Sequence, residues 1–334
     1  MKNRQIHLVK RPQGMVTLDC FALIEAELPP LQEGQVLVQN LWLSLDPYMR
    51  GRMDDVKSYS AVQPLNAVMV GGTAGVVLES KNPKFATGDT VVGAFGWQEH
   101  GISDGSGQYG APLRKVTDRI PLSAYLGCVG MPGVTAWHGL NKIIEPKAGE
   151  TVVVTAASGA VGSVVGQLAR AKGARVIGIA GGAAKCAYVE DELGFDACID
   201  YKAGDVAAML AKAAPKGIDG VFENVGGAIF DALLARMNAF GRIAVCGLIS
   251  GYNGQAVPLG NVRSILTNRL KVQGFIVSDH LEEWPEALAE LGDLVASGRL
   301  KYRESVAQGL ESAPRAFIGL LKGENFGKQL VKLV

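Results

Sequence analysis

The sequence has no excess of charge of either sign. Its 334 residues include 33 Lys and Arg and 32 Asp and Glu, which gives a formal net charge of +1. Such a chain has no long-range field that would draw it to nucleic acid or to an anionic membrane. We therefore expect neither as a partner, and any polyanionic ligand must be held by a local site.

Long hydrophobic runs are also missing. No stretch approaches the roughly 20 apolar residues that a membrane-spanning helix needs. The opening segment, MKNRQIHLVKRP, has no apolar core of the kind found in secretion signals. The five cysteines are odd in number and scattered, which argues against a disulfide framework and for a reducing compartment. We expect a soluble, cytoplasmic protein.

The sequence lacks a recognisable metal-ligand pattern. A catalytic zinc needs three ligands of the Cys, His or carboxylate type, and the N-terminal part offers only His7, His100, Cys20 and its carboxylates, at no recognisable spacing. No Ser-His-Asp order with a G-x-S-x-G nucleophile elbow appears either. We predict no metal site, and we interpret His100 and His138 as structural. The cysteines are interpreted as small buried apolar residues: Cys20, Cys128, Cys186, Cys198 and Cys246.

What is present fits a two-domain globular protein. The length is too great for one ordinary core, and 48% hydrophobic residues against 19% charged residues excludes disorder. Up to about residue 125 the pattern is one of short strands separated by turns, with candidates at 36–40, 72–78 and 89–94.

From residue 125 the pattern changes to alternating strands and helices. A helix is predicted at 133–140 and another at 161–172, ended by Gly173. Alternation at this spacing predicts a doubly wound parallel sheet. A helix at 313–321 and a strand at 329–333 close the chain, and the sequence leaves open whether that strand returns to the first domain. The predicted sheet strands are 151–155, 175–180, 197–200, 220–223 and 242–246.

The segment 157–162 reads ASGAVG, a G-x-G-x-x-G fingerprint with Ala at its first position, placed between a strand and a helix. Gly159 would let the backbone approach a pyrophosphate, and Gly162 would let the helix pack closely on the sheet. The helix start would present its free N–H groups to the phosphates. We predict that Gly159, Ala160, Val161 and Gly162 hold a dinucleotide.

The end of the second sheet strand indicates which dinucleotide. An NAD site usually has an acid there to bond the ribose 2′-hydroxyl, but this strand ends at Ala180 and continues with Gly181. Lys185 follows a few residues later, and Tyr201 and Lys202 come after the next strand. The absence of an acid and the presence of lysines favour NADPH.

With the fingerprint placed, five further segments are distinctive. They are 43–53 (LSLDPYMRGRM), 131–136 (MPGVTA), 222–227 (FENVGG), 246–253 (CGLISGYN) and 323–328 (GENFGK). Together they resemble the prostaglandin reductase, leukotriene hydroxydehydrogenase and plant alkenal double-bond reductase group, with the bacterial curcumin reductase type, of the medium-chain dehydrogenase/reductase superfamily. The resemblance runs in order from about residue 35 to the C-terminus.

The resemblance implies an α/β protein with a Rossmann-type doubly wound parallel sheet and a GroES-like, mostly β catalytic domain. The catalytic domain would comprise 1–124, completed by 305–334, and the NADPH-binding domain 125–304. It further implies no zinc, a homodimer, and a small α,β-unsaturated carbonyl compound as substrate.

By matching position, Lys185 and Tyr201 would contact the adenosine 2′-phosphate, and Tyr48 and Tyr252 would face the substrate. Gly251, before Tyr252, would leave that loop freer than a bulkier residue would. The residues implied on the nicotinamide side are Asn224, Cys246, Gly247, Ile249, Ser250, Phe275, Val277 and Asn325.

The expected reaction is NADPH-dependent reduction of a carbon–carbon double bond conjugated to a carbonyl. Hydride arriving at the β-carbon leaves an enolate, so a donor aimed at the carbonyl oxygen would accelerate the step. Tyr252 is the first choice for this donor, with water or a ribose hydroxyl as the other proton sources. Asp46, Arg50 and Arg52 are interpreted as a structural ion-pair set. Two other functions stay open: a zinc-free quinone reductase and a non-catalytic NADPH-binding protein.

Overall fold

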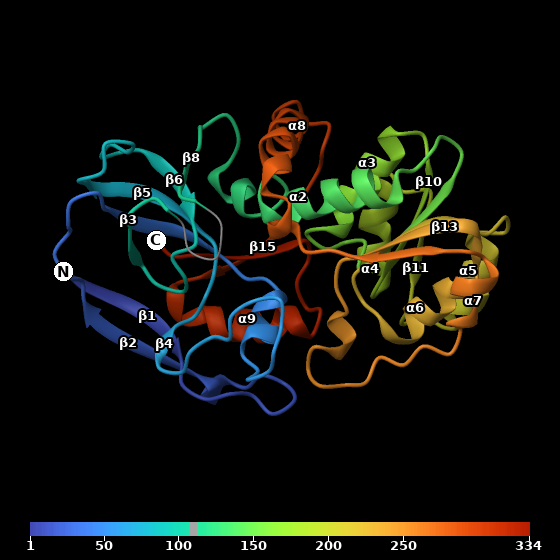
Figure 1. The fold of residues 1–334 in the computed structure, drawn as a ribbon, viewed down its shortest axis with the longest axis horizontal. Helices are drawn as coiled ribbons and strands as arrows, with labels where there is room; N and C mark the ends of the chain where they lie inside the picture. Colours follow the sequence, from blue (N-terminus) through green and yellow to red (C-terminus); the bar gives the residue numbers. More distant parts are fainter. Residues whose placement is uncertain (107–111) are drawn as a thin grey trace. The chain divides into compact units, whose positions relative to one another are not determined.

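The computed structural model describes residues 1–106 and 112–334. It divides the chain into two compact units (Figure 1). One, the terminal unit, consists of Met1–Gly127 and Glu304–Val334, and the other, the central unit, consists of Cys128–Arg303. Each unit is described by itself.

The terminal unit is built mainly from antiparallel strands. One sheet has the order β15-β16-β3-β5-β6-β8, with β7 also paired to β3, and a smaller sheet has the order β2-β1-β4. The predicted strands at 36–40, 72–78 and 89–94 are confirmed as β3, β5 and β6. The strands are β1 (Lys2–Leu8), β2 (Phe21–Glu27), β3 (Val36–Ser44), β4 (Ala67–Val68), β5 (Thr73–Ser80), β6 (Thr90–Gly93), β7 (His100–Ser103), β8 (Arg114–Lys115), β15 (Glu304–Gln308) and β16 (Lys328–Lys332).

The last strand of the chain belongs to the terminal unit. β16 pairs antiparallel with β3, with Val331 opposite Leu43. The question that the sequence left open is thereby settled, because the C-terminal strand returns to the first part of the chain. The helices here are α1 (Tyr48–Arg52) and α9 (Ala313–Leu321), with short helical turns at η1 (Leu18–Cys20), η2 (Leu122–Leu126) and η8 (Leu310–Ser312).

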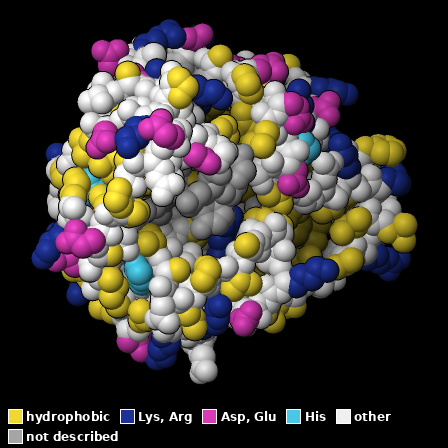
Figure 2. All heavy atoms as spheres, turned by 60° about the vertical axis from the view of Figure 1, so that its left-hand side comes forward, with side chains coloured by type: hydrophobic (Ala, Val, Ile, Leu, Met, Phe, Trp, Pro, Cys, Tyr) yellow, Lys and Arg dark blue, Asp and Glu magenta, His cyan; other side chains and the backbone are white. Residues whose placement is uncertain are grey.

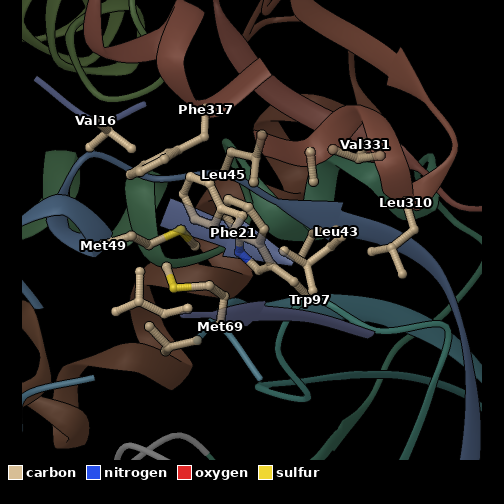
Figure 3. Close-up of a cluster of buried hydrophobic side chains, with 14 of the residues drawn as sticks. Val16, Phe21, Leu43, Leu45, Met49, Met69, Trp97, Leu310, Phe317 and Val331 are labelled. Carbon is tan, nitrogen blue, oxygen red and sulfur yellow. The ribbon is translucent and has the colours of Figure 1, made fainter. Parts of the chain in front are cut away.

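An aromatic cluster lies at the centre of the core of the terminal unit (Figure 3). The rings of Phe21 and Trp97 stack with centroids 5.4 Å apart, and Phe317 of α9 meets both rings edge-on. Met49 and Met69 fill the space beside them. Full burial of such side chains stabilises a fold by roughly 1.5–3 kcal/mol each, so this cluster fixes α1 and α9 on the strands.

The central unit is a six-stranded sheet in which every pair is parallel, with helices on both faces (Figure 1). The predicted doubly wound sheet is confirmed, and so is the α/β fold class with a separate β-rich part. β13 begins five residues earlier than predicted, and β14 was not predicted. In spatial order the strands are β11 (Ala197–Asp200), β10 (Arg175–Ala180), β9 (Thr151–Thr155), β12 (Ile218–Glu223), β13 (Met237–Val245) and β14 (Lys271–Gly274).

The order of these strands locates the ligand edge. From β9 the chain runs outward to β10 and β11, then crosses to β12 on the other side of β9. Ligands of such sheets bind at the carboxyl ends of the strands where this reversal occurs. The helical segments are α2 (Met131–His138), η3 (Gly139–Ile144), α3 (Gly162–Ala171), α4 (Ala183–Ala187), η4 (Tyr188–Glu192), α5 (Val206–Ala213), α6 (Gly227–Leu234), η5 (Ile249–Gly251), α7 (Arg263–Thr267), η6 (Val277–Asp279), η7 (Leu281–Glu283) and α8 (Trp284–Ala296).

Residue patterns explain these elements. All five residues of β9, TVVVT, are buried, as expected for a strand covered on both faces. The predicted helix at 161–172 is confirmed as α3, and Gly173, with φ +81°, takes the left-handed conformation that ends it. Among the described residues, none of the helices has the length and apolar character needed to cross a membrane.

One sequence interpretation needs adjustment. Three of the five cysteines are buried, but Cys198, in the edge strand β11, and Cys246, directly after β13, are partly exposed. The near-zero net charge corresponds to a mixed surface: on the face drawn in Figure 2, basic and acidic side chains are interspersed.

Candidate functional site

The turn between β9 and α3 has the shape of a phosphate cradle. A Cβ added to Gly162 would lie 2.5 Å from the carbonyl oxygen of Ala156, so no larger residue fits without a shift of the backbone. At Gly159 the same oxygen would be 3.1 Å away. Ala160 and Val161 lie half-buried between them. In the turn, the Gly159 amide donates to the Ala156 carbonyl at 2.9 Å, and the Ser163 amide donates to the Gly159 carbonyl at 3.1 Å. The start of α3 carries the partial positive charge of a helix N-terminus, which favours a pyrophosphate there.

A second group lies at the carboxyl ends of β10 and β11, and we call it the cationic corner: Gly181, Lys185, Tyr201 and Lys202. A Cβ on Gly181 would lie 2.8 Å from the hydroxyl of Tyr201, so these two are in close contact. Partial burial lowers the pKa of the Lys185 ammonium group, and the charge of Lys202 lowers it further. The two ammonium groups repel one another, and a 2′-phosphate bound beside them would relieve that repulsion.

Asp200 is a member of this region that sequence reasoning missed. Its Oδ1 accepts the amide N–H groups of Gly182, at 2.8 Å, and Lys202, at 3.0 Å. These backbone bonds lower the pKa of its carboxyl group. Asp200 therefore fixes the backbone on either side of the cationic corner. An acid that contacts the nucleotide is usually found at the end of β10, whereas Asp200 ends the neighbouring strand β11.

A third group lies at the carboxyl ends of β12 and β13, and we call it the acidic corner: Glu223, Asn224, residues 246–250 and Tyr252. Asn224 bonds β9, since its backbone N–H donates to Thr155 Oγ1 at 2.7 Å and its Nδ2 donates to the Thr155 carbonyl at 2.8 Å. The side chain of Asn224 thus joins the ends of β9 and β12.

Backbone bonds hold residues 246–250 against the end of β12. The amides of Cys246 and Gly247 donate to the Glu223 carbonyl at 2.9 and 3.2 Å, and the Ile249 amide donates to the Asn224 carbonyl at 3.2 Å. The amide and hydroxyl of Ser250 both donate to the Val225 carbonyl, at 3.0 and 2.6 Å. The structure therefore brings these residues together with Asn224.

Tyr252 follows η5 at the end of this turn. A Cβ on Gly247 would lie 3.0 Å from the Tyr252 hydroxyl, so the phenol lies against the backbone of the turn. The expectation that Gly251 leaves this loop freer does not describe its surroundings. A Cβ there would meet Val257 at 3.0 Å, and the glycine allows close packing.

Phe275 and Val277 follow β14. The ring of Phe275 is buried, meets Phe222 edge-on at 6.1 Å and lies 5.1 Å from the ring of His138. The Val277 carbonyl accepts the indole N–H of Trp284 at 3.2 Å. Because the Phe275 side chain points into the core, this residue can offer a ligand mainly its backbone.

Within the described residues, one group could supply three metal ligands: His138, His280 and Glu283, whose ligand atoms all lie within 4.8 Å. The two imidazoles stack with centroids 4.1 Å apart, and His138 Nδ1 lies 2.6 Å from a Glu283 oxygen. Stacked rings direct their nitrogen lone pairs along nearly parallel planes, not at a common point. We interpret the group as a hydrogen-bonded cluster, and the structural role of His138 stays a prediction.

Glu223 lies within the FENVGG segment, but its sequence context does not mark it as a site residue. Its side chain is 0% exposed, and its Oε1 accepts the amides of Val225, at 2.5 Å, and Gly226, at 2.7 Å, and the Thr155 hydroxyl, at 3.2 Å. Burial raises the pKa of Glu223 to about 7 against the opposing effect of these donors. The pattern FENVGG carries no sign of this burial, which comes from the strands on either side of β12.

Tyr48 and Asn325 belong to the terminal unit. Tyr48 begins α1, packs partly buried against the aromatic cluster, and has the Arg52 guanidinium 5.1 Å from its ring centroid. Asn325 donates from Nδ2 to the Gly327 carbonyl at 2.7 Å. The structure does not test their predicted roles.

The polar residues around α1 do form ion pairs. Asp46 Oδ1 lies 2.7 Å from Lys328 Nζ, and Arg50 bonds Asp54 at 2.7 Å. Sequence reasoning expected a structural role for Asp46, Arg50 and Arg52 but missed Lys328, which is 282 residues away in sequence. His100 lies in β7, where partial burial lowers the pKa of its imidazole.

Comparisons with known proteins agree with these observations. A family model described as the N-terminal domain of oxidoreductase matches residues 4–109, and one described as zinc-binding dehydrogenase matches residues 160–293. NADPH-dependent curcumin reductase of Escherichia coli (strain K12) is 47% identical over 340 residues, covering 99% of this chain and 97% of the relative. Prostaglandin reductase 1 of Rattus norvegicus is 44% identical, with 97% of each chain covered.

A solved structure is similar over the same range. CurA from Vibrio vulnificus in complex with NADPH has a TM-score of 0.93 and 47% identity, covering 99% of each chain. The similarity therefore extends over both units.

Proposed function

Because the chain belongs to the zinc-independent reductase group of the medium-chain dehydrogenase/reductase family, we propose that it uses NADPH to reduce the carbon–carbon double bond of α,β-unsaturated ketones or aldehydes. The observation that carries this proposal is 47% identity over 99% of the chain to an NADPH-dependent curcumin reductase. The phosphate cradle and the cationic corner support it from the geometry of the central unit.

The residues present fit NADPH. The phosphate cradle between β9 and α3 would hold the pyrophosphate. A Cβ at Gly162 would fill this cradle. Lys185, Tyr201 and Lys202 would hold the adenosine 2′-phosphate. The acidic corner would receive the nicotinamide end, with the backbone of residues 275–277 and Asn325 as further contacts. When bound, NADPH supplies the hydride that reduces the β-carbon of the substrate.

The chain itself provides a donor for the substrate oxygen. As the double bond is reduced, negative charge develops on the carbonyl oxygen, and a hydrogen bond to that oxygen stabilises the transition state. Tyr252 donates this bond from its hydroxyl, which is held against the backbone at Gly247. Phenols remain protonated at neutral pH. The same hydroxyl, or water, provides the proton that the α-carbon takes up, and Tyr48 would be a further substrate contact.

The proposal includes no metal in the reaction, a homodimer and a cytoplasmic location. A metal would polarise the carbonyl as a Lewis acid, and here the Tyr252 hydroxyl takes that part. Activity that survives dialysis against a chelator supports the first point, and activity restored only by zinc contradicts it. Light scattering of the purified protein tests the homodimer.

The experiment that tests the function is a steady-state screen of enals, enones and quinones, with NADPH and NADH supplied side by side. The proposal predicts NADPH oxidation with enals and enones, and slower oxidation with NADH. Turnover restricted to quinones would indicate a quinone reductase. Nucleotide binding without any turnover would indicate a non-catalytic NADPH-binding protein.

A further inference from the structure

Two carboxylate side chains are buried among the described residues, Asp46 and Glu223. Asp46 is paired with the Lys328 ammonium at 2.7 Å. Glu223 forms no ion pair within residues 1–106 and 112–334. Its Oε2 is buried and has no hydrogen-bond partner among those residues. A buried charge without a counter-ion opposes folding, whereas a paired one is a common structural element.

The hydrogen bonds that Glu223 makes do not require an acid. A glutamine could accept the amides of Val225 and Gly226 and the Thr155 hydroxyl through its own Oε1. It would do so without the cost of burying a charge. Some residues lower the stability of a protein at positions where a neutral residue of the same shape would fit. Such residues are expected at functional sites. Glu223 also ends β12, at the edge where sheets of this kind bind ligands.

The charge of Glu223 is not cancelled by its neighbours. The titratable group facing it is the Cys246 thiol, whose pKa burial raises to about 12, so that it stays neutral. Thr155 on β9 and the amides of residues 225–226 provide the remaining contacts, and none of them is ionisable. Since burial raises the pKa of Glu223 to about 7, its charge appears as the pH rises through neutrality.

The turns proposed to receive the nicotinamide end rest directly on this residue. The Glu223 carbonyl accepts the amides of Cys246 and Gly247, and its carboxyl accepts those of Val225 and Gly226. We propose that Glu223 is a charge-tuning residue of the cofactor site, whose carboxylate strengthens binding of the oxidised, positively charged nicotinamide ring relative to the reduced, neutral ring. This inference rests on the proposed function, which places the ring at the acidic corner.

A comparison of two nucleotides isolates this effect. NADP⁺ and NADPH carry the same phosphates and the same adenosine, so contacts at the cradle and the cationic corner contribute equally to both affinities. They differ by one positive charge on the nicotinamide ring. The ratio of their dissociation constants therefore reports the electrostatic potential at the ring, to which a nearby buried charge contributes strongly.

The test is calorimetric or fluorescence titration of the full chain with each nucleotide from about pH 6 to about pH 9. For the wild type we expect the preference for NADP⁺ over NADPH to increase about 3- to 10-fold across this range. Glu223→Gln should bind both nucleotides with a ratio that does not change with pH. Glu286→Gln, an exposed acid on α8, is the matched control and should follow the wild type.

The inference would be overturned if the ratio of the two dissociation constants did not change with pH in the wild type. It would also be overturned if the ratio changed with pH equally in Glu223→Gln. The wild-type titration decides the matter even if the variant does not fold. Failure of both nucleotides to bind would overturn the proposed function together with the inference. Binding of both with a flat ratio would overturn the inference alone.

Discussion

The cationic corner and the acidic corner lie at the same edge of one sheet but differ in charge and burial. At the cationic corner, Lys185 and Lys202 place two positive charges near each other, and Lys202 is exposed. At the acidic corner, Glu223 is fully buried and the contacts are mostly backbone hydrogen bonds. The difference indicates a division of roles: the cationic corner selects the nucleotide, and the acidic corner sets the chemistry at its reactive end.

Tyr252→Phe should separate chemistry from binding most clearly. Loss of one donor to a developing oxyanion typically lowers turnover about 100- to 1000-fold. We expect kcat on enones to fall by about this amount, while NADPH affinity stays close to that of the wild type. Tyr59→Phe, at an exposed tyrosine, is the control. Little change in kcat on enones would remove Tyr252 from its proposed role.

Gly162→Ala should weaken the cradle that serves both corners. The added Cβ would lie 2.5 Å from the Ala156 carbonyl oxygen, so the turn must open. We expect NADPH and NADH affinities to fall together by about 100-fold, or ~3 kcal/mol. Gly292→Ala is the matched control, since its added Cβ would meet only Val129, at 3.8 Å. Unchanged affinity in Gly162→Ala would mean that the nucleotide does not use this turn.

Glu223→Gln should alter how stability depends on pH. The folded-state pKa of Glu223, about 7, lies above the ordinary value of 4.5. The folded protein therefore binds the proton more tightly, and its stability decreases as the pH rises from about 4.5 to about 7. The variant should lack this decrease. Its free energy of unfolding, relative to that of the wild type, should therefore increase by about 2 kcal/mol between about pH 5 and about pH 8. Urea unfolding of both proteins at the two pH values measures this difference. If the stability of the variant relative to the wild type fell as the pH rose, the prediction would be contradicted.

Lys185→Ala should affect only the selection of nucleotide. Removal of a charge-assisted contact to phosphate costs ~1.5 kcal/mol or more. We expect NADPH affinity to fall about 10-fold, NADH affinity to remain nearly unchanged, and kcat at saturating NADPH to stay within about two-fold. Lys212→Ala, at an exposed lysine on α5, is the control. An equal loss for NADH and NADPH would remove Lys185 from the 2′-phosphate.

Much of the central unit could be predicted because its signals are local. β9 is a run of β-branched residues, and Gly173 marks the end of α3. β14 was missed because KVQG is short and polar, as an edge strand can be. The start of β13 was placed too late because its first residues, MNAFG, include Phe240 in a left-handed conformation and do not form a continuous apolar run.

The parts of the site that lie within recognisable sequence motifs could be predicted. The cradle and Lys185 follow from the order of strand, glycines and helix. The burial of Glu223 depends on strands that pair through space, and the pairing of Lys328 with Asp46 joins the two ends of the chain. Asp200 was missed because its contact with Gly182 crosses from β11 to the end of β10. Tertiary contacts of this kind leave no local pattern in a single sequence.

The central claim is that the turn at 156–162 holds NADPH with its phosphorylated adenosine at the cationic corner and its nicotinamide at the acidic corner. The most direct measurement is a crystal structure of the protein soaked with NADPH. We predict the pyrophosphate at the turn formed by residues 159–162, the 2′-phosphate beside Lys185 and Lys202, and the ring beside Asn224 and Gly247. An empty turn, with the nucleotide bound elsewhere, would contradict the account.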